Sequence, residues 1–170
     1  MCARRYSAGP QLPCDVWEAA GTPCVAAHSM TRALYAAYDG PLYSGRRADT
    51  NATANVKVVA AGGAADAQAQ DTFCKGTSCT IQTIFDQSAL GNDLSTAPPG
   101  GAAHQPDKGC TADHDRQVLG GRTVYGAVVE GGMGYRRANT TGVATGDDPA
   151  SQQALAGGTH FHTACRLEPA

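Results

Sequence analysis

The chain has 170 residues, and its 13 Lys and Arg nearly balance its 15 Asp and Glu, leaving a formal net charge of −2. Only three of the basic residues are lysines, so the sequence offers no concentrated positive surface for a phosphate backbone, and we expect no nucleic-acid partner. No run of 18 apolar residues occurs, which excludes a membrane-spanning helix, and we expect no membrane partner.

Large apolar side chains are scarce, although 42% of the residues count as hydrophobic. Alanine accounts for 31 residues, whereas Leu, Ile, Val and Phe together number 23. That share lies below the roughly 20% typical of a well-filled core, but the balanced charge argues against disorder. The composition therefore predicts one folded domain with a poor core.

In chain order, the first predicted element is a helix over residues 23–37. Thr22 suits its N-cap and Pro23 its first turn, an apolar stripe follows at helical spacing, and Gly40 ends it. One or two helical turns are expected within residues 64–73.

The rest of the chain alternates short β-like runs with turn residues. The predicted strands cover residues 42–46, 52–59, 80–86, 122–130 and 134–137. Doubled glycines such as Gly120-Gly121 suit tight corners, while residues 102–121 read as a polar, irregular surface loop. We therefore predict an all-β fold, an antiparallel β-sandwich with one short helix near the N-terminus.

Seven cysteines and two glycosylation sequons favour a secreted glycoprotein. The cysteine spacing suggests local loops closed by disulfides: Cys14 and Cys24 flank one loop, and Cys74 and Cys79 enclose another. The sequons begin at Asn51 and Asn139. No signal-peptide pattern opens the sequence. Because the cysteines and sequons nevertheless favour secretion, we expect an extracellular protein whose leader is absent from this copy.

Neither a metal site nor a catalytic carboxylate pair is evident. The residues with zinc-ligand chemistry are His160, His162 and Cys165, with Cys110 and His114 in the long loop, but they lack a recognised ligand spacing. We predict no metal and no cofactor. Aspartates beside Gly and Ser are typical turn formers. The carboxylates considered are Asp15, Glu18, Asp66, Asp71, Asp86, Asp93, Glu130, Asp147 and Asp148.

Several segments together resemble the start of the type B α-L-arabinofuranosidases, glycoside hydrolase family fifty-four. They are CDVWEAAGTPCVAAHSMTRALY (14–35), AGGAADAQAQDTFCKGTSCTIQTIFDQSALGNDL (61–94), APPGG (97–101), YGAVVEGGMGYRRANTTGVATGD (125–147) and GGTHFHTAC (157–165). The resemblance implies a concanavalin-like catalytic β-sandwich, of which residues 14–165 are the N-terminal half. Residues 1–13 and 166–170 depart from the family pattern.

The resemblance also implies roles for particular residues. It pairs Cys14 with Cys24 and Cys74 with Cys79. Cys165 matches the first of two adjacent cysteines whose disulfide lies against the bound arabinose, but Arg166 replaces the second. The family's glutamate nucleophile and aspartate acid/base lie beyond Ala170, so no catalytic residue is assigned here and the chain alone is expected to be inactive.

The activity implied by the resemblance is release of terminal arabinofuranosyl units from arabinan or arabinoxylan, with retention of configuration. The expected partner is therefore an arabinose-containing cell-wall polysaccharide. Two alternatives remain open: a noncatalytic, lectin-like carbohydrate-binding β-sandwich, and an unproductive gene product. The pairing of Cys2 and Cys110 also stays open.

Overall fold

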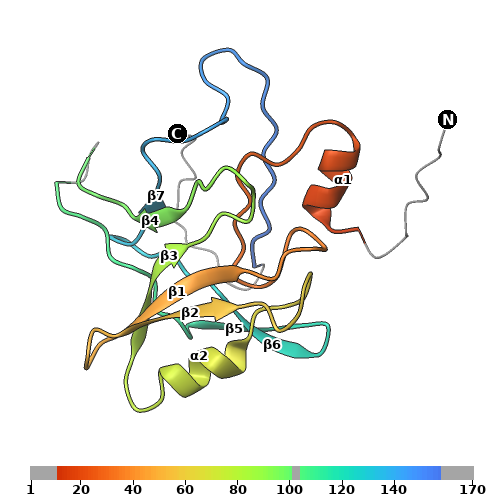
Figure 1. Cartoon of the computed structure of the whole chain (residues 1–170). Coiled ribbons are helices and arrows are strands. Elements are labelled where there is room, and N and C mark those ends of the chain that lie inside the picture. The colour runs from red at the N-terminus through yellow and green to blue at the C-terminus, as the bar shows by residue number, and fades with distance from the viewer. Residues whose placement is uncertain (1–10, 101–103, 158–170) are drawn as a thin grey trace.

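The computed structural model describes residues 11–100 and 104–157. Within these ranges the chain forms two short helices and seven strands (Figure 1). The elements are α1 (Pro13–Ala19), β1 (Pro41–Arg47), β2 (Thr53–Lys57), α2 (Ala67–Phe73), β3 (Cys79–Ile84), β4 (Leu94–Thr96), β5 (Asp115–Leu119), β6 (Arg122–Gly126) and β7 (Tyr135–Arg136). No helix of the described ranges is long and apolar enough to cross a bilayer.

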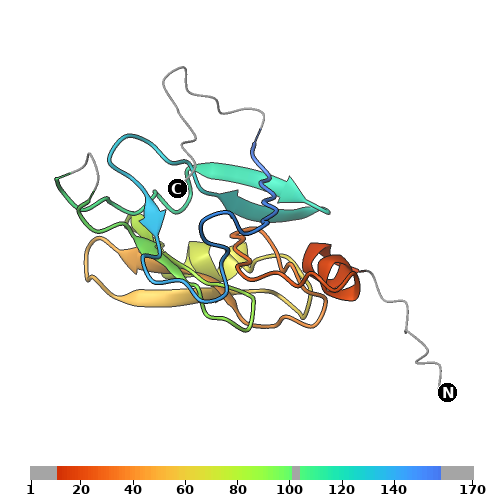
Figure 2. The same cartoon turned by 90° about the horizontal axis from the view of Figure 1, so that it is seen from above.

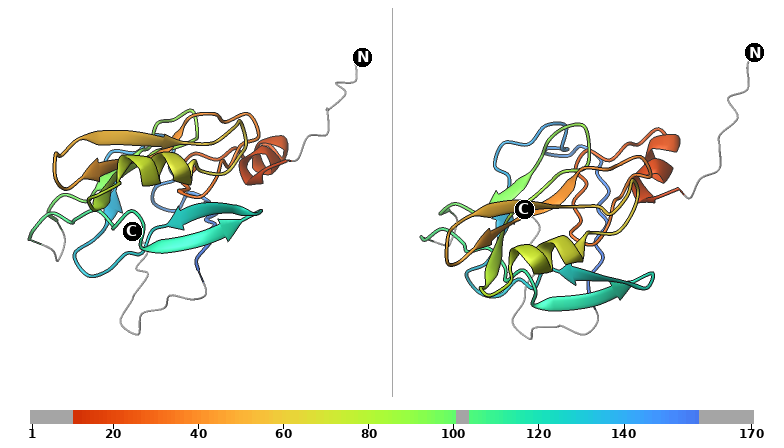
Figure 3. Two further views of the ribbon diagram at one scale, coloured as in Figure 1. Left: turned by 90° about the horizontal axis from the view of Figure 1, so that it is seen from below. Right: turned by 60° about the horizontal axis from the view of Figure 1, so that its bottom comes forward.

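The strands form two antiparallel sheets. The main sheet has five strands in the order β2-β1-β3-β4-β7, and β5 pairs only with β6 in a hairpin. Seen from above, the hairpin occupies a layer of its own beside the main sheet (Figure 2). Helix α2 contacts both β2 and β6 at the side where the two layers meet (Figure 3). The predicted all-β antiparallel sandwich is thus confirmed.

The core lies between these layers and extends to the other face of β1. Tyr43 of β1, Ile81 of β3 and Val124 of β6 are almost completely buried. Four successive residues of β1, 42–45, are buried, which requires cover on both faces of that strand. The Tyr43 hydroxyl donates to Gln70 Oε1 of α2 at 2.7 Å, so a polar group inside a small core has its partner.

The predicted helix over residues 23–37 is wrong, because this segment consists of bends and isolated bridges. Its backbone is hydrogen-bonded to distant residues: Ala27 N donates to Asp86, and Ala33 N donates to Gly63 O. These tertiary bonds use donors that a helix would need, and they outweigh the intrinsic preference of an alanine-rich stretch. The N-terminal helix is instead α1, where Pro13 starts the first turn and the Asp15 carboxylate accepts from Leu12 N at 2.9 Å.

Most predicted strands are present, with two omissions. β1, β2, β3, β6 and β7 overlap the expected ranges, and α2 lies within residues 64–73. β4 was not predicted, and β5 lies in residues 102–121, which were expected to be irregular. Gly120 and Gly121, with φ of 56° and 78°, form the corner between β5 and β6, because both positions require the left-handed region that glycine enters without strain.

Candidate functional site

The loop that follows β3 is organised around the buried carboxylate of Asp86. Asp86 Oδ1 accepts hydrogen bonds from Ala27 N and Ser88 N, both at 2.8 Å. Its Oδ2 accepts from Ser88 Oγ at 2.6 Å and from Asn92 N at 2.8 Å. Burial by itself would raise the pKa of Asp86, but these hydrogen bonds bring the pKa below its usual value. The group is therefore held as an anion and has a structural role.

Asn92 extends this cluster to two distant segments. Its side chain is 1% exposed, and its Nδ2 donates to Val25 O at 2.8 Å and to Thr141 O at 2.9 Å. Its Oδ1 accepts from Thr141 N at 2.8 Å, and its carbonyl accepts from His28 Nε2 at 2.8 Å. One amide side chain thus joins the segment after α1, the loop after β3 and the segment after β7. We call Asp86, Ser88 and Asn92 the loop hub.

The nearby Asp93 also bonds to the backbone. Asp93 Oδ1 accepts from Asp86 N at 2.8 Å. Asp148 behaves similarly near the end of the described chain, where its Oδ2 accepts from Thr145 N at 3.5 Å. These contacts agree with the interpretation of Asp86, Asp93 and Asp148 as loop-forming residues.

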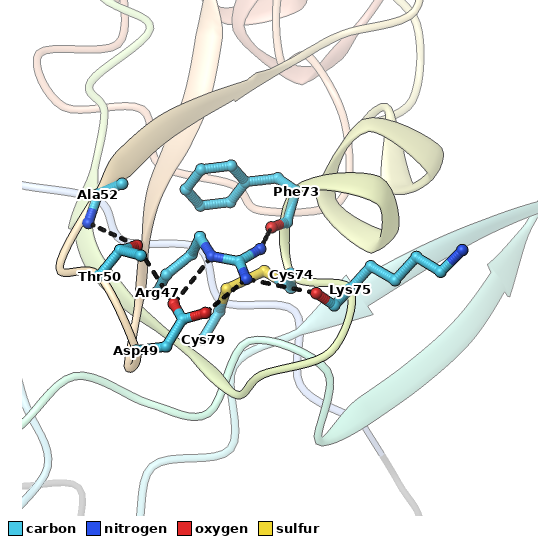
Figure 4. Close-up of polar contacts among 8 residues, drawn as sticks. All are labelled: Arg47, Asp49, Thr50, Ala52, Phe73, Cys74, Lys75 and Cys79. Atoms are coloured by element: carbon cyan, nitrogen blue, oxygen red, sulfur yellow. Dashed lines mark hydrogen bonds and ion pairs between the residues drawn. A yellow bond between two sulfur atoms is a disulfide. The ribbon is translucent and has the colours of Figure 1, made fainter.

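A second cluster surrounds the Cys74–Cys79 disulfide (Figure 4). Arg47 at the end of β1 forms an ion pair with Asp49, 2.7 Å between Nη2 and Oδ2, which lowers the pKa of Asp49 to about 2. The same guanidinium donates to the carbonyls of Phe73 and Lys75 and lies 5.8 Å from the centre of the Phe73 ring. A cation thus binds the carbonyl of the last residue of α2, which the helix leaves unpaired, and the carbonyl of Lys75 just beyond the helix.

A small cavity of about 120 Å³ opens beside this disulfide. Two carboxylates line it, Asp71 and Asp113, and Asp71 accepts a hydrogen bond from the Tyr125 hydroxyl at 2.8 Å. Of the two, only Asp71 is a candidate from sequence, since no motif draws attention to Asp113. Ligand sites usually measure roughly 300–1,000 Å³, so this cavity is too small to enclose an oligosaccharide.

The expected disulfides are both formed. Cys14 pairs with Cys24 across a Cα–Cα distance of 5.6 Å, and Cys74 pairs with Cys79 across 5.8 Å. Cys110 is a buried thiol in the described part of the chain, and burial raises its pKa. Its backbone N donates to the Tyr135 hydroxyl at 2.8 Å.

The remaining sequence candidates fall into two groups. Asn51 and Asn139 are exposed. Cys165, His160, His162 and Cys2 lie outside the described residues, so the predicted sugar contact of Cys165 stays a prediction. Among the residues that the structure describes, no group of three His, Cys, Asp or Glu side chains is arranged to hold a metal ion.

Comparison with known proteins gives one consistent family. A family model described as alpha-L-arabinofuranosidase B, catalytic, matches residues 13–168. The chain is 48% identical over 157 residues to the probable alpha-L-arabinofuranosidase B of Aspergillus fumigatus, covering 90% of this chain and 31% of that relative. It is 46% identical over 167 residues to alpha-L-arabinofuranosidase B of Aspergillus niger, covering 96% and 33%. The chain therefore spans about a third of the length of these curated relatives.

Solved structures agree with this result. A crystal structure of an arabinofuranosidase complexed with arabinofuranosyl-alpha-1,2-xylobiose superposes with a TM-score of 0.78 at 47% identity. A GH54 arabinofuranosidase soaked with a cyclic sulfate inhibitor gives a TM-score of 0.77 at 46% identity. Each match covers 81% of this chain and 29% of the solved chain. Sequence and backbone thus point to the same relatives.

Proposed function

Because the chain belongs to the family of alpha-L-arabinofuranosidase B catalytic domains, we propose that it forms the N-terminal part of a catalytic β-sandwich that removes terminal arabinofuranosyl units. The substrates are arabinan or arabinoxylan, the arabinose-bearing polysaccharides of plant cell walls. The single observation that carries this proposal is that family membership extends over residues 13–168, which include both disulfides and the loop hub. The lectin-like alternative has no comparable support, since the match is to a hydrolase catalytic domain.

The reaction that we propose for the assembled domain is a double displacement. One carboxylate attacks the anomeric carbon while a carboxylic acid protonates the departing oxygen, and water then releases the sugar from the enzyme. Retention in this way requires two carboxyl groups about 5–5.5 Å apart on either side of the bond. We assign neither group to this stretch, because the resemblance locates both of them beyond Ala170.

The contribution of the present residues is then to build and fix a wall of the domain. Asp86 and Asn92 tie together segments that are 59 and 49 residues apart, and two disulfides close the loops beside α1 and α2. A site that holds a sugar in a reactive geometry needs rigid surroundings, because misplacement by about 1 Å can cost about 100-fold in rate. The loop hub and the disulfides supply that rigidity in our proposal.

The test compares this chain alone with a chimera. In the chimera, residues 1–165 are followed by the corresponding downstream part of the Aspergillus fumigatus relative. We expect arabinose release from an aryl α-L-arabinofuranoside by the chimera and none by the 170-residue polypeptide. Turnover by the 170 residues alone would contradict the proposed division of roles. A folded but inactive chimera, beside an active intact relative, would contradict the proposed contribution to the catalytic domain.

Secretion is a further part of this proposal. Two disulfides require an oxidising compartment to form and persist, and the polysaccharides in question lie outside the cell. Fractionation of a culture of the source cells, with an antibody against this chain, is the direct measurement. Detection in the medium supports the proposal, and exclusive retention in the cytosol contradicts it.

A further inference from the structure

The turn between β1 and β2 presents an asparagine in an unusual backbone conformation. Arg47 N donates to Ala52 O at 2.9 Å, and Asn51 N donates to Arg47 O at 3.1 Å, which closes the turn. Asn51 has φ of 57° and is the one non-glycine residue of the described ranges with positive φ. Asparagine tolerates this left-handed region better than most residues, so the turn favours Asn at this position without any ligand.

The side chain of Asn51 is nevertheless unused by the fold. Its neighbours bond to one another: Thr50 Oγ1 donates to Asp49 Oδ1 at 3.2 Å, and Ala52 N donates to Thr50 Oγ1 at 3.4 Å. In the described part of the chain, no hydrogen bond involves the carboxamide of Asn51 or the hydroxyl of Thr53. Asn51, Ala52 and Thr53 are all exposed. The three residues of an Asn-x-Thr sequon are therefore accessible together on a hydrogen-bonded turn.

We propose that Asn51 is a site of N-linked glycosylation and that the folded chain carries the glycan at no cost to its packing. In the reaction, Asn51 Nδ2 attacks C1 of an oligosaccharide held on a lipid pyrophosphate. The new bond joins Nδ2 to C1, the bond from C1 to the phosphate oxygen breaks, and the lipid pyrophosphate leaves. The amide nitrogen releases one proton, and the departing phosphate oxygen takes the electron pair of the broken C1–O bond as one added negative charge, so atoms and charge balance. The group that accepts the sugar is thus the side-chain amide of Asn51, and the compound that supplies the sugar is a lipid-linked oligosaccharide.

The place of the turn in the fold supports this assignment. It projects from the end of β1 and β2 that lies away from α1 (Figure 1). The buried residues of these strands lie before or after the turn, since burial in β1 ends at Gly45 and resumes in β2 only at Val56. A glycan on Asn51 consequently extends into solvent without displacing a core side chain.

The second sequon has different surroundings. Asn139 is also exposed, but Thr141, its third residue, has both its N–H and its carbonyl bound to the buried Asn92 side chain. Both bonds use backbone groups of Thr141, so this sequon lies directly against the loop hub, whereas no hydrogen bond of the described residues joins the turn that carries Thr53 to the hub. For this reason Asn51 gives the cleaner test, and modification of Asn139 stays a prediction from its sequon.

The experiment expresses the full chain behind a secretion leader in yeast and measures the intact mass before and after treatment with peptide-N-glycosidase. Asn51→Gln and Thr53→Ala are each expected to lose the mass of one glycan relative to the parent chain. Thr53→Ser is the matched control, since it keeps a sequon and is expected to keep the glycan. Asn139→Gln serves as a background in which a glycan on Asn51 is the only one that the sequons allow.

Two results would overturn the inference. One is an unmodified peptide containing Asn51 in secreted, folded parent protein. The other is a drop in melting temperature on glycan attachment, measured between glycosylated parent and enzymatically deglycosylated parent, because the structure leaves the glycan nothing to displace. Neither result depends on arabinofuranosidase activity, so this inference and the proposed function fail independently.

Discussion

Asp86 is the residue on which most of the loop after β3 depends. Its carboxylate accepts four hydrogen bonds, three from backbone N–H groups and one from a hydroxyl. An aspartate beside Ser88 can be predicted to form a turn, because the short side chain reaches its own backbone. The bond to Ala27, 59 residues away, could not be predicted, since no local pattern records a long-range partner.

We expect Asp86→Asn to lower the free energy of unfolding by about 2 kcal/mol at neutral pH, because the amide presents a donor where the loop supplies only donors. Urea unfolding measures this difference. Asp148→Asn is the matched control, because Asp148 is exposed. We expect this variant to lose no more than about 0.5 kcal/mol of the free energy of unfolding.

The same variant has a defined pH dependence. The pKa of Asp86 is lowered in the folded state, so its stabilising effect is complete above the unfolded-state value of about 3.9 and disappears as the pH falls through the folded value. The deficit of Asp86→Asn should therefore shrink towards acidic pH. A deficit that stays constant over this range would show that charge at Asp86 does not support the fold.

At the scale of elements, prediction succeeded where local pattern and tertiary environment agree. β1 and β3 are short β-like runs bounded by turn residues, and they lie side by side in the main sheet, where Tyr43 and Ile81 are buried. Residues 23–37 have helical spacing and caps, but Cys24 is tied to Cys14, and their backbone donors bind distant groups. β4 has three residues, too few for a period, and β5 is largely polar, with Val118 66% exposed. Both strands are determined by their hydrogen-bonded neighbours, β3 and β7 for β4 and β6 for β5, and not by their amino-acid composition.

The β5–β6 hairpin is anchored by its contact with α2. The hydroxyl of Tyr125 in β6 donates to Asp71 of α2 at 2.8 Å. Burial is the larger cause and this hydrogen bond the second cause of a raised pKa of Tyr125. We expect Tyr125→Phe to lose about 1 kcal/mol of stability and to speed hydrogen exchange in β5 and β6 more than in β1 and β3.

A suitable control for that variant is Tyr35→Phe, whose hydroxyl makes a longer bond of 3.4 Å to Cys24 O. It is expected to leave exchange in the hairpin unchanged. Uniform acceleration over both sheets in Tyr125→Phe would contradict a local anchoring role for the pair.

For the whole molecule, covalent bridges matter because the aliphatic core is small. In the chain-entropy account, closing the loop at Cys14–Cys24 contributes about 3 kcal/mol and closing the shorter loop at Cys74–Cys79 about 2 kcal/mol. Together these approach the lower end of the 5–15 kcal/mol typical of a domain. We expect reduction of both bridges to shift the urea midpoint strongly downwards, as followed by far-ultraviolet circular dichroism.

Single-bridge variants separate the two contributions. We expect the double variant Cys14→Ala, Cys24→Ala to lose more free energy of unfolding than the double variant Cys74→Ala, Cys79→Ala. The first bridge closes the longer loop. In addition, Arg47 still binds the carbonyls of Phe73 and Lys75 after the second bridge is removed. The reverse order would indicate that native-state contacts of the second bridge outweigh loop closure.

The bridging role of Asn92 also affects the order of events while the chain is being synthesised. Its side chain bonds Val25, made 67 residues earlier, and Thr141, made 49 residues later. The first partner is already outside the ribosome when Asn92 emerges, but the second has yet to be translated. The Asn92 side chain therefore cannot complete its hydrogen bonds until Thr141 has left the ribosome, so this corner of the protein completes its folding late.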